Sequence, residues 1–374
     1  MIERQLLKYI KKDLFRGKAL ILLGARQVGK TTLLERIRSD LSLTTLSLTG
    51  DDPNTREQLE NISSSQLKNL IGNNKLVIID EAQRVKNIGI TLKLITDNFK
   101  NVQLIATGSS AFELANEINE PLTGRKYEYT LFPISWNELS ENSNILERNS
   151  QLNHRLVYGF YPDVINHSGE ERRILEFLSG SYLYKDIFTF QQIRKPEVLE
   201  KLLKAIALQV CNEVSYNELA QITNSDPATI ERYLLLLEQT YVIFRLYSFS
   251  RNQRNELKRS RKIYFFDNGI RNSILANFNT LELRNDIGAL WENFLVSERL
   301  KYLHYNQISS NRYFWRTTQQ QEIDYIEERN GKLFAFEFKW NKNAKPKFSK
   351  TFTENYKNSE CKLITPDNFE EFVL

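Results

Sequence analysis

The sequence of 374 residues is poor in cysteine and histidine, the residues that build disulfide frameworks and zinc sites. It contains Cys211 and Cys361, which lie 150 positions apart, and three histidines. This content excludes a disulfide-stapled fold and a thiolate-rich metal site. Glycine (14) and proline (8) are also scarce, while 41% of the residues are hydrophobic. That composition excludes collagen-like, disordered and linker-dominated chains, and it indicates two or three compact domains.

Long apolar runs are missing as well. No run approaches the roughly 18 residues that span a bilayer, and the longest near the start is Ala19–Leu23. The N-terminal sequence MIERQLLKYIKK places charges among its apolar residues, whereas a signal peptide needs an uninterrupted apolar stretch. We therefore expect a cytoplasmic protein that has no membrane partner.

The small positive charge is concentrated in one stretch of the chain. The whole sequence carries 51 basic and 46 acidic side chains, for a net charge of +5. Residues 244–262 alone carry seven basic and one acidic side chain, so the net charge of this stretch exceeds that of the whole chain. Clustering of this kind matters more than the total for binding a polyanion, so a local nucleic-acid contact is expected here.

Residues 1–135 alternate apolar strand patterns with amphipathic helix patterns, which favours an α/β domain built on a parallel sheet. Strands are expected at Ala19–Leu23, Thr44–Leu48, Leu76–Asp80, Val102–Thr107 and Tyr127–Phe132. Helices are expected at Lys30–Leu41, Gln58–Ile71 and Ile88–Phe99. Residues 136–195 have mostly helical patterns, which we interpret as a helical lid.

Residues 196–374 mix short helices and strands. Helices are expected at Ser215–Thr223, Asp226–Gln239 and Leu290–His304. Strands are expected at Tyr241–Phe249, Lys262–Phe266, Tyr313–Arg316, Glu322–Glu327 and Lys332–Trp340. We divide this part into a winged helix-turn-helix at 196–266 and a C-terminal α/β domain at 267–374.

A phosphate-binding loop follows the first expected strand. The sequence GARQVGKT at 24–31 fits the pattern GxxxxGK[ST] and opens a helix, which is the context that this motif requires. Lys30 is placed to reach the β- and γ-phosphates of ATP, and the Thr31 hydroxyl to hold Mg²⁺. The nucleotide-binding residues are predicted to be Gly24, Ala25, Arg26, Gln27, Val28, Gly29, Lys30, Thr31 and Thr32.

Two adjacent carboxylates end the strand Leu76–Asp80. Its four apolar residues suit a central parallel strand, and Asp80 and Glu81 follow at the carboxyl edge. Asp80 is a predicted Mg²⁺ ligand, and Glu81 could polarise the attacking water, which would make the protein a hydrolase. The alternative is an ordinary helix cap.

Four segments together, GARQVGKTT, IIDEAQ, ATGSS and LTGRK, resemble the AAA+ ATPase domain of a widespread prokaryotic family. In that family a C-terminal domain of unknown function follows, and the resemblance covers essentially the whole chain. By position, Ser109 resembles the polar sensor after the fourth strand. Arg125 resembles an arginine that meets the γ-phosphate in cis or from a neighbouring subunit. The second arrangement would imply a homo-oligomer. A surface ion pair is the alternative for Arg125.

The concentrated positive charge falls where the wing of a winged helix would lie. Two short helices and a β-hairpin describe this module. The basic residues of the run are Arg245, Arg251, Arg254, Lys258, Arg259, Arg261 and Lys262. Contact with DNA phosphates through this wing would be mostly independent of base sequence. Winged helices also bind proteins, and the second helix carries Glu231 and Glu238 against Arg232, so a protein partner is the alternative.

A β-hairpin near the C-terminus brings two carboxylates together. Asn330 and Gly331 form the strongest short hairpin signal, since both suit positive φ. A two-residue turn there pairs Arg329 with Lys332 and places Asp324 opposite Glu337. Carboxylates so close are destabilising unless a cation joins them, and oxygen ligands suit Mg²⁺ or Mn²⁺. The same register places Glu322 opposite Lys339, so an ordinary cross-strand ion pair is the alternative.

The set Glu292, Asp324 and Glu337-x-Lys339 resembles the PD-(D/E)xK nuclease superfamily, although the proline of that name is absent before Asp324. The resemblance implies a metal site formed by Glu292, Asp324 and Glu337, with Lys339 as a catalytic residue. We therefore expect an AAA+ core with a lid, a winged helix and a nuclease-like domain. The expected function is ATP hydrolysis associated with DNA, and the alternative is a nucleotide-dependent switch that binds a protein partner without cleavage.

Overall fold

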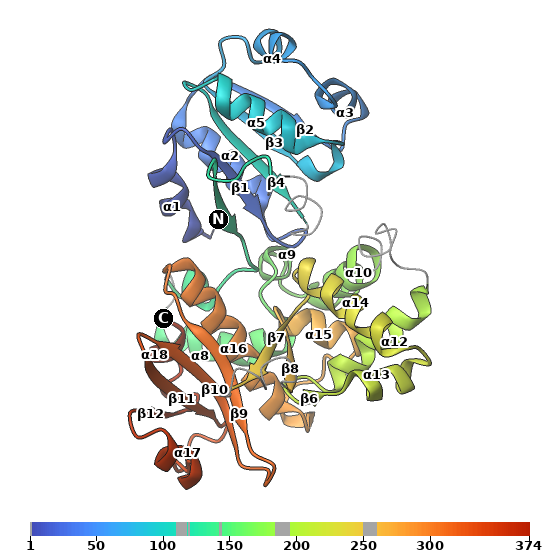
Figure 1. The fold of residues 1–374 in the computed structure, drawn as a ribbon. Helices are drawn as coiled ribbons and strands as arrows, with labels where there is room; N and C mark the ends of the chain where they lie inside the picture. The colour runs from blue at the N-terminus through green and yellow to red at the C-terminus, as the bar shows by residue number, and fades with distance from the viewer. Residues whose placement is uncertain (1, 110–117, 119, 142–143, 184–194, 250–259) are drawn as a thin grey trace. The chain divides into compact units, whose positions relative to one another are not determined.

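The computed structural model describes residues 2–109, 118, 120–141, 144–183, 195–249 and 260–374 (Figure 1). The chain forms two compact units. The first comprises residues 1–134 with 239–241, and the second comprises residues 135–238 with 242–374. The sequence predicted a boundary at 135, one residue from this division. The segments predicted as the lid, the winged helix and the nuclease-like domain lie in the second unit, apart from residues 239–241.

The first unit is a five-stranded parallel sheet flanked by helices. The strand order is β2-β3-β4-β1-β5, so β4 lies between β1 and β3. The strands are β1 (Ala19–Leu23), β2 (Thr45–Thr49), β3 (Leu76–Asp80), β4 (Gln103–Gly108) and β5 (Lys126–Thr130). The helices are α1 (Leu6–Asp13), α2 (Lys30–Leu41), α3 (Pro53–Leu59), α4 (Ser64–Ile71), the 3₁₀ turn η1 (Ala82–Arg84) and α5 (Ile88–Asn98).

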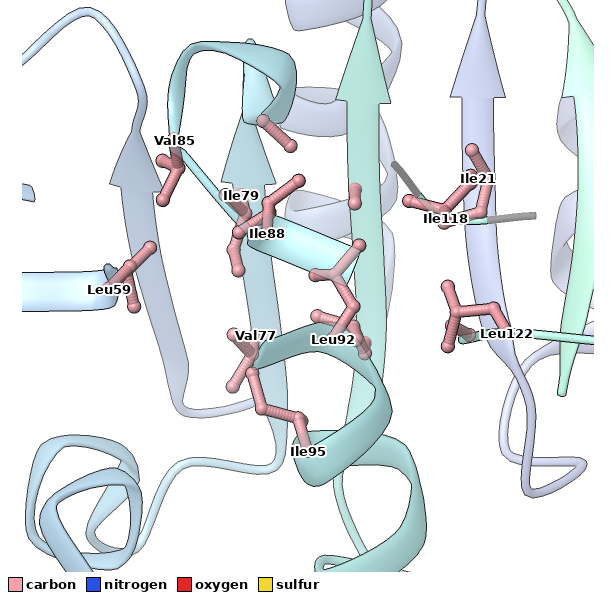
Figure 2. Packing of buried hydrophobic residues seen from close by; sticks show 14 of the residues in the cluster. Ile21, Leu59, Val77, Ile79, Val85, Ile88, Leu92, Ile95, Ile118 and Leu122 are labelled. Carbon is pink, nitrogen blue, oxygen red and sulfur yellow. The ribbon is translucent and has the colours of Figure 1, made fainter. Parts of the chain in front are cut away.

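The core of this unit explains why the central strands are mostly apolar. Every residue of β1 and β4 is buried, because helices cover both faces of a parallel sheet. Figure 2 shows Val77 and Ile79 of β3 against Ile88, Leu92 and Ile95 of α5. Each such buried side chain contributes about 1.5–3 kcal/mol. This packing holds the carboxyl ends of β1, β3 and β4 at one edge of the sheet.

One predicted helix of this unit is wrong. The sequence predicted a single helix over Gln58–Ile71, but α3 ends at Leu59 and α4 begins at Ser64. Asn61 adopts a positive φ of 56°, which a helix cannot accommodate. Ser63 then caps α4 through a reciprocal pair of hydrogen bonds with Gln66. The other predicted boundaries in this unit differ by no more than two residues.

The second unit is built on a seven-stranded mixed sheet with the order β12-β11-β10-β9-β7-β8-β6. The strands are β6 (Glu213–Val214), β7 (Ile243–Ser248), β8 (Arg261–Phe265), β9 (Asn311–Arg316), β10 (Glu322–Arg329), β11 (Lys332–Phe338) and β12 (Glu360–Ile364). The helices before β8 are α7 (Trp136–Ser140), α8 (Ile145–Tyr158), α9 (Pro162–Asn166), α10 (Glu171–Phe177), η2 (Leu178–Leu183), α12 (Pro196–Leu208), α13 (Tyr216–Thr223) and α14 (Pro227–Gln239). Those after it are α15 (Asn268–Ile274), η4 (Leu281–Leu283), α16 (Ile287–Tyr305), α17 (Lys350–Asn355) and α18 (Glu370–Val373).

A single sheet therefore joins two of the predicted modules. β7 and β8 form the antiparallel hairpin expected after α13 and α14, and β6 pairs with β8. β7 also pairs in parallel with β9, through Tyr247 and Tyr313. Sequence patterns did not predict this pairing, because it joins strands more than 60 residues apart. The two modules consequently share one hydrogen-bonded sheet.

The C-terminal hairpin has the predicted register. Asn330 and Gly331 have φ values of 51° and 76°, as a two-residue turn of this kind requires. Arg329 pairs with Lys332, and the register continues to Tyr325 opposite Phe336.

None of the helices among the described residues is long and apolar enough to cross a bilayer.

Candidate functional site

The phosphate-binding loop connects β1 to α2 at the carboxyl edge of the first sheet. Gly29, at the N-terminus of α2, has a φ of 95°. A Cβ atom at Gly24 would lie 2.2 Å from the Leu131 carbonyl oxygen, so only glycine fits there. The buried Lys30 donates hydrogen bonds of 2.9 Å to the carbonyls of Gly24 and Ala25. The loop thus places an ammonium group at the N-terminus of a helix, where phosphates bind.

Asp80, at the end of β3, lies beside this loop. The Thr31 hydroxyl donates a hydrogen bond of 2.9 Å to Asp80 Oδ2. Thr107 of β4 donates to the other carboxylate oxygen of Asp80. A hydroxyl and a carboxylate side by side are oxygen donors of the kind that Mg²⁺ prefers. Thr31 and Asp80 therefore fit a nucleotide-bound Mg²⁺, which would neutralise charge on the phosphates.

Glu81 is held by three neighbouring groups. Its backbone N–H donates a hydrogen bond of 3.1 Å to the Thr107 hydroxyl. Its carboxylate accepts one of 2.6 Å from the Gln83 amide and one of 3.1 Å from Ser109. Gln83 also donates to Ser109 at 3.0 Å. The sequence predicted that Ser109 would lie near the nucleotide site, and the structure brings it to Glu81.

The backbone around Glu81 allows no larger residue at Gly50. Glu81 has a positive φ of 49°, which is uncommon for a residue with a side chain. A Cβ atom at Gly50 would lie 2.2 Å from the Glu81 carbonyl oxygen. The Gly50 N–H donates a hydrogen bond of 2.8 Å to the Asp80 carbonyl. Gly50 therefore allows the chain after β2 to pack against the backbone of Asp80 and Glu81.

Arg125 lies at the amino ends of the strands, opposite to the phosphate-binding loop at their carboxyl ends. This position corrects the predicted contact with the γ-phosphate in cis. Arg125 precedes β5, whose first residue, Lys126, pairs with Ala19 at the start of β1. The loop follows the other end of β1. The Arg125 guanidinium forms an ion pair of 2.8 Å with Asp97 of α5. Action from a neighbouring subunit stays a prediction.

Two residues of the basic stretch are not available to phosphates, which corrects their predicted role. Lys262 of β8 is buried. Arg245 of β7 pairs with Glu238 and donates a hydrogen bond of 2.7 Å to the Tyr216 hydroxyl. The Arg261 guanidinium lies over the Tyr216 ring, 4.1 Å from its centroid. The other predicted contacts lie outside the described residues: Arg251, Arg254, Lys258 and Arg259.

The predicted C-terminal site is a cluster of carboxylates and lysines in the second unit. Lys339 Nζ lies 3.2 Å from Glu337 and 3.9 Å from Asp324. Asp324 also accepts a hydrogen bond of 2.8 Å from the Phe338 N–H. Glu322 does not pair with Lys339, contrary to the alternative drawn from the register. Its ion pairs are with Lys262, at 2.5 Å, and Arg316, at 3.7 Å.

Glu292 of α16 also contacts Lys262, the ion-pair partner of Glu322. Lys262 Nζ lies 3.2 Å from Glu292 Oε1, which also accepts a hydrogen bond of 2.8 Å from the Tyr264 hydroxyl. Burial raises the pKa of Glu292 to about 7, although Lys262 opposes the shift. Burial and the Asp324 charge raise the pKa of Glu337 to about 8. Burial alone would lower the pKa of Lys262, but Glu292 and Glu322 hold it above its ordinary value.

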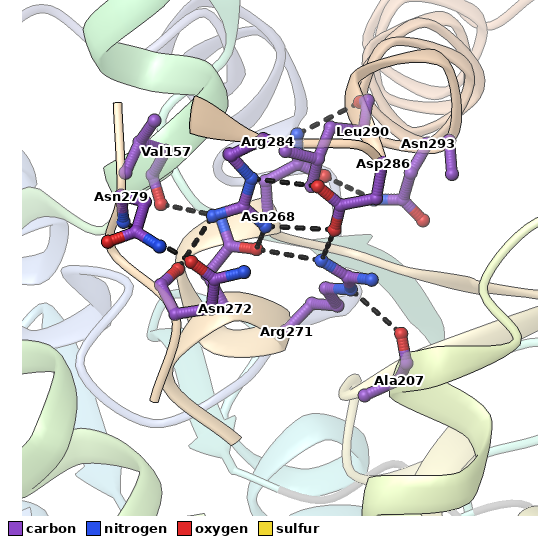
Figure 3. A network of polar contacts seen from close by, with 12 residues as sticks. Val157, Ala207, Asn268, Arg271, Asn272, Asn279, Arg284, Asp286, Leu290 and Asn293 are labelled. Atoms are coloured by element: carbon purple, nitrogen blue, oxygen red, sulfur yellow. Dashed lines mark hydrogen bonds and ion pairs between the residues drawn. The ribbon is translucent and has the colours of Figure 1, made fainter. Parts of the chain in front are cut away.

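A buried polar network fixes the start of α16, which carries Glu292. Arg284 donates hydrogen bonds of 2.8 Å to Asp286 and 3.0 Å to Asn272, and Arg271 donates one of 2.8 Å to the Ala207 carbonyl (Figure 3). Asn293 bonds both the N–H and the carbonyl of Phe265, at 2.7 and 3.0 Å. These contacts hold α16 against β8 and so place Glu292 beside Lys262.

Comparison with known proteins finds family models that match three successive segments of the chain. Residues 16–140 match a family model described as an AAA domain. The chain carries an AAA-like P-loop ATPase domain. Residues 149–281 and 287–370 match two further models, described as the domains of unknown function DUF8612 and DUF4143. The nuclease-like assignment of the C-terminal part thus stays a prediction.

The relatives with similar sequences are uncharacterized proteins. One from Mycobacterium tuberculosis is 26% identical over 338 residues, which cover 88% of this chain and 72% of that protein. One from Haemophilus influenzae is 25% identical over 205 residues, which cover 52% and 51%. A Walker-type ATPase of Pyrococcus abyssi has a TM-score of 0.51 at 18% identity, covering 74% of this chain and 96% of that one. This last likeness is one of fold.

The two predicted metal sites differ in how well they fit a cation. In the ATPase domain, Thr31 and Asp80 present adjacent oxygens. In the C-terminal cluster, each of Glu292, Asp324 and Glu337 lies within 4 Å of a lysine ammonium. Among the residues that the structure describes, no three His, Cys, Asp or Glu side chains are grouped to hold a metal ion. The C-terminal cluster therefore does not fit a metal ion as it is folded.

Sequence reasoning missed several residues of these sites. Gln83 lies in the segment IIDEAQ, two residues after Glu81, and that spacing places it on the turn η1. Thr107 is the last residue of the predicted strand Val102–Thr107, and the polar end of an apolar strand was the available signal. The position of Lys262 depends on the packing of α16 against β8, and no local pattern indicates it.

Proposed function

We propose that this protein binds and hydrolyses ATP in its ATPase domain and uses the nucleotide state to control contact between its C-terminal unit and DNA. The observation that carries the hydrolysis step is the position of Glu81. Ser109 and Gln83 hold its carboxylate at the same sheet edge as the phosphate-binding loop. In this geometry Glu81 can accept a proton from the attacking water.

The remaining groups of the site divide the other tasks. Lys30 and the N-terminus of α2 bind the phosphates. Thr31 and Asp80 would hold the Mg²⁺ ion, which supplies positive charge to the β- and γ-phosphates when bound. Ser109 contacts Glu81 directly, so it can report on the γ-phosphate and orient the carboxylate. Arg125 could act on a neighbouring subunit of a homo-oligomer.

The proposed DNA contact rests on the charge of residues 244–262, with seven basic and one acidic side chain. The order α13, α14, β7 and β8 is that of a winged helix, in which a hairpin contacts phosphates beside a helix. Because Arg245 and Lys262 are engaged inside the unit, the contact is assigned to Arg251, Arg254, Lys258, Arg259 and Arg261. Such a contact weakens as salt concentration rises.

ATP turnover with and without DNA tests this contact. We expect DNA to stimulate turnover by the wild type, and the double variant Arg254→Glu, Arg259→Glu to lose the stimulation while keeping its basal turnover. The matched control reverses two exposed lysines elsewhere in the unit, Lys345→Glu and Lys350→Glu, and should keep the stimulation. Turnover that is equal with and without DNA would contradict the proposed DNA contact.

A second candidate function is a nucleotide-dependent switch whose C-terminal unit binds a protein without cleavage. The helices α12, α13 and α14 each expose a large apolar side chain: Leu208 is 69% exposed, Ile222 49% and Leu235 43%. Exposed apolar groups on neighbouring helices favour a protein partner over a phosphate backbone. ATP turnover that is indifferent to DNA would favour this candidate.

Metal-dependent cleavage is the finer activity that the sequence predicts for Glu292, Asp324, Glu337 and Lys339. Its support is that Lys339 contacts Glu337, two residues before it, and Asp324 across the hairpin. The lysines within the cluster weigh against cleavage by the chain as it is folded. A nuclease assay on the ATPase preparation, with Asp324→Ala as the control, tests this activity separately from ATP hydrolysis.

A further inference from the structure

Two lysines and Arg316 supply the positive charge of the C-terminal acidic cluster, and the two lysines differ in how firmly they are held. The side chain of Lys339 is 51% exposed, so it can move into water. The side chain of Lys262 is 3% exposed. Its ammonium lies 2.5 Å from Glu322 and 3.2 Å from Glu292. Lys262 is therefore the fixed cation of the cluster.

The surroundings of Lys262 leave its ammonium little freedom. It lies over the Phe314 ring, 5.3 Å from the centroid. The backbone of β8 is tied to α16 by Asn293, which bonds the N–H and the carbonyl of Phe265 at 2.7 and 3.0 Å. Glu292, the neighbour of Asn293, is thus held at a constant distance from Lys262. A buried ammonium with two carboxylate partners stays charged and in place.

We propose that Lys262 is the built-in counter-cation of this cluster and keeps divalent metal ions out of it. The cluster comprises Glu292, Glu322, Asp324 and Glu337. A metal ion that recruited Glu292 together with Asp324 and Glu337 would have to approach the Lys262 ammonium, which repels it. Oε1 of Glu292 is already engaged by this ammonium, at 3.2 Å, and by the Tyr264 hydroxyl, at 2.8 Å. The inference concerns the same cluster as the cleavage prediction, argues against metal-dependent cleavage there, and is independent of ATP hydrolysis.

Removal of the ammonium should turn the cluster into a metal site. In Lys262→Met a side chain of similar length replaces the charge, so Glu292 loses its ammonium partner and Glu322 keeps its ion pair with Arg316, at 3.7 Å. Four carboxylates whose remaining cations are the partly exposed Lys339 and Arg316 present the oxygen donors that Mn²⁺ and Mg²⁺ bind. We expect Lys262→Met to bind Mn²⁺ at least about tenfold more tightly than the wild-type cluster does.

The experiment is a titration of nucleotide-free protein with Mn²⁺, followed by the loss of the electron paramagnetic resonance signal of free Mn²⁺. All proteins carry Asp80→Asn, so that the Thr31–Asp80 pair of the ATPase domain does not contribute. The full-length chain is compared with Lys262→Met and with Lys262→Met, Glu337→Gln. We expect one tight Mn²⁺ in the single variant, and its loss when Glu337 is also changed. Equal Mn²⁺ binding with and without Lys262 would overturn the proposal.

Tryptophan fluorescence would reveal whether Lys262→Met folds. If it does not, a second comparison still tests whether the native cluster excludes Mn²⁺. The chain with native Lys262 is titrated beside Asp324→Asn. The proposal expects no Mn²⁺ binding that depends on Asp324, and binding that does depend on it would refute the proposal. Both readouts are metal affinities, so an ATPase domain without turnover would leave them unchanged.

Discussion

Ser109 donates a hydrogen bond of 3.1 Å to the carboxylate of Glu81, which ties the end of β4 to the residue that follows β3. Loss of this bond should leave Glu81 less well oriented. We expect Ser109→Ala to retain ATP binding and to lower turnover by about tenfold, because Gln83 still holds the carboxylate. Steady-state ATP turnover and nucleotide-induced thermal stabilisation measure the two properties. A variant that turns over ATP normally would show that Ser109 does not orient Glu81.

Gly50 approaches Glu81 too closely for any side chain. Its Cβ atom in Gly50→Ala would lie 2.2 Å from the Glu81 carbonyl, so the backbone there must shift. A small displacement of a reacting group can lower the rate on the order of 10²-fold. We expect a fall of that order in the ATP turnover of Gly50→Ala. Gly288→Ala is the control, because a Cβ atom there meets nothing within 4 Å. Equal turnover in both variants would contradict this account of Gly50.

The C-terminal cluster should make stability depend on pH. In the folded chain the pKa of Glu337 is about 8 and that of Glu292 about 7, against an ordinary value of 4.5. Between about pH 5 and 8 the folded state therefore holds protons that the unfolded state has released. The free energy of unfolding should fall as pH rises through this window, by up to about 1.4 kcal/mol per pH unit for each proton held.

Tryptophan fluorescence can report this dependence, because all four tryptophans, at 136, 291, 315 and 340, lie in the second unit. Urea unfolding is measured at several pH values for the wild type and for Glu337→Gln. The variant cannot titrate at that position, so its stability should change less across the window. Stability that rises with pH in the wild type would contradict the raised pKa values.

Local signals predicted the features that depend on neighbouring residues. Asn330-Gly331 fixed the hairpin register, because both residues adopt the positive φ that the turn needs. The strand Leu76–Asp80 was recognisable from four apolar residues and a terminal carboxylate. The break before α4 was also signalled, since Ser63 and Gln66 have the spacing of a capping box. The longer helical pattern around them concealed it.

Features that depend on distant residues were not predictable from one sequence. Lys262 belongs to a basic run, yet its ammonium is buried because β8 packs against α16, 30 residues further on. The parallel pairing of β7 with β9 likewise follows from tertiary packing. Arg125 has the sequence context of a nucleotide-contacting arginine, but the strand register places it with Asp97 at the other edge of the sheet.

The most direct test of the account is ATP turnover measured together with ATP binding in Glu81→Gln and Lys30→Ala. We predict that Glu81→Gln binds ATP and lowers turnover by on the order of 10²-fold or more, because the amide cannot accept the proton of the attacking water. Lys30→Ala should lose binding, and Lys75→Ala, an exposed lysine before β3, should retain both properties. Normal ATP turnover by Glu81→Gln would contradict the proposed mechanism of hydrolysis.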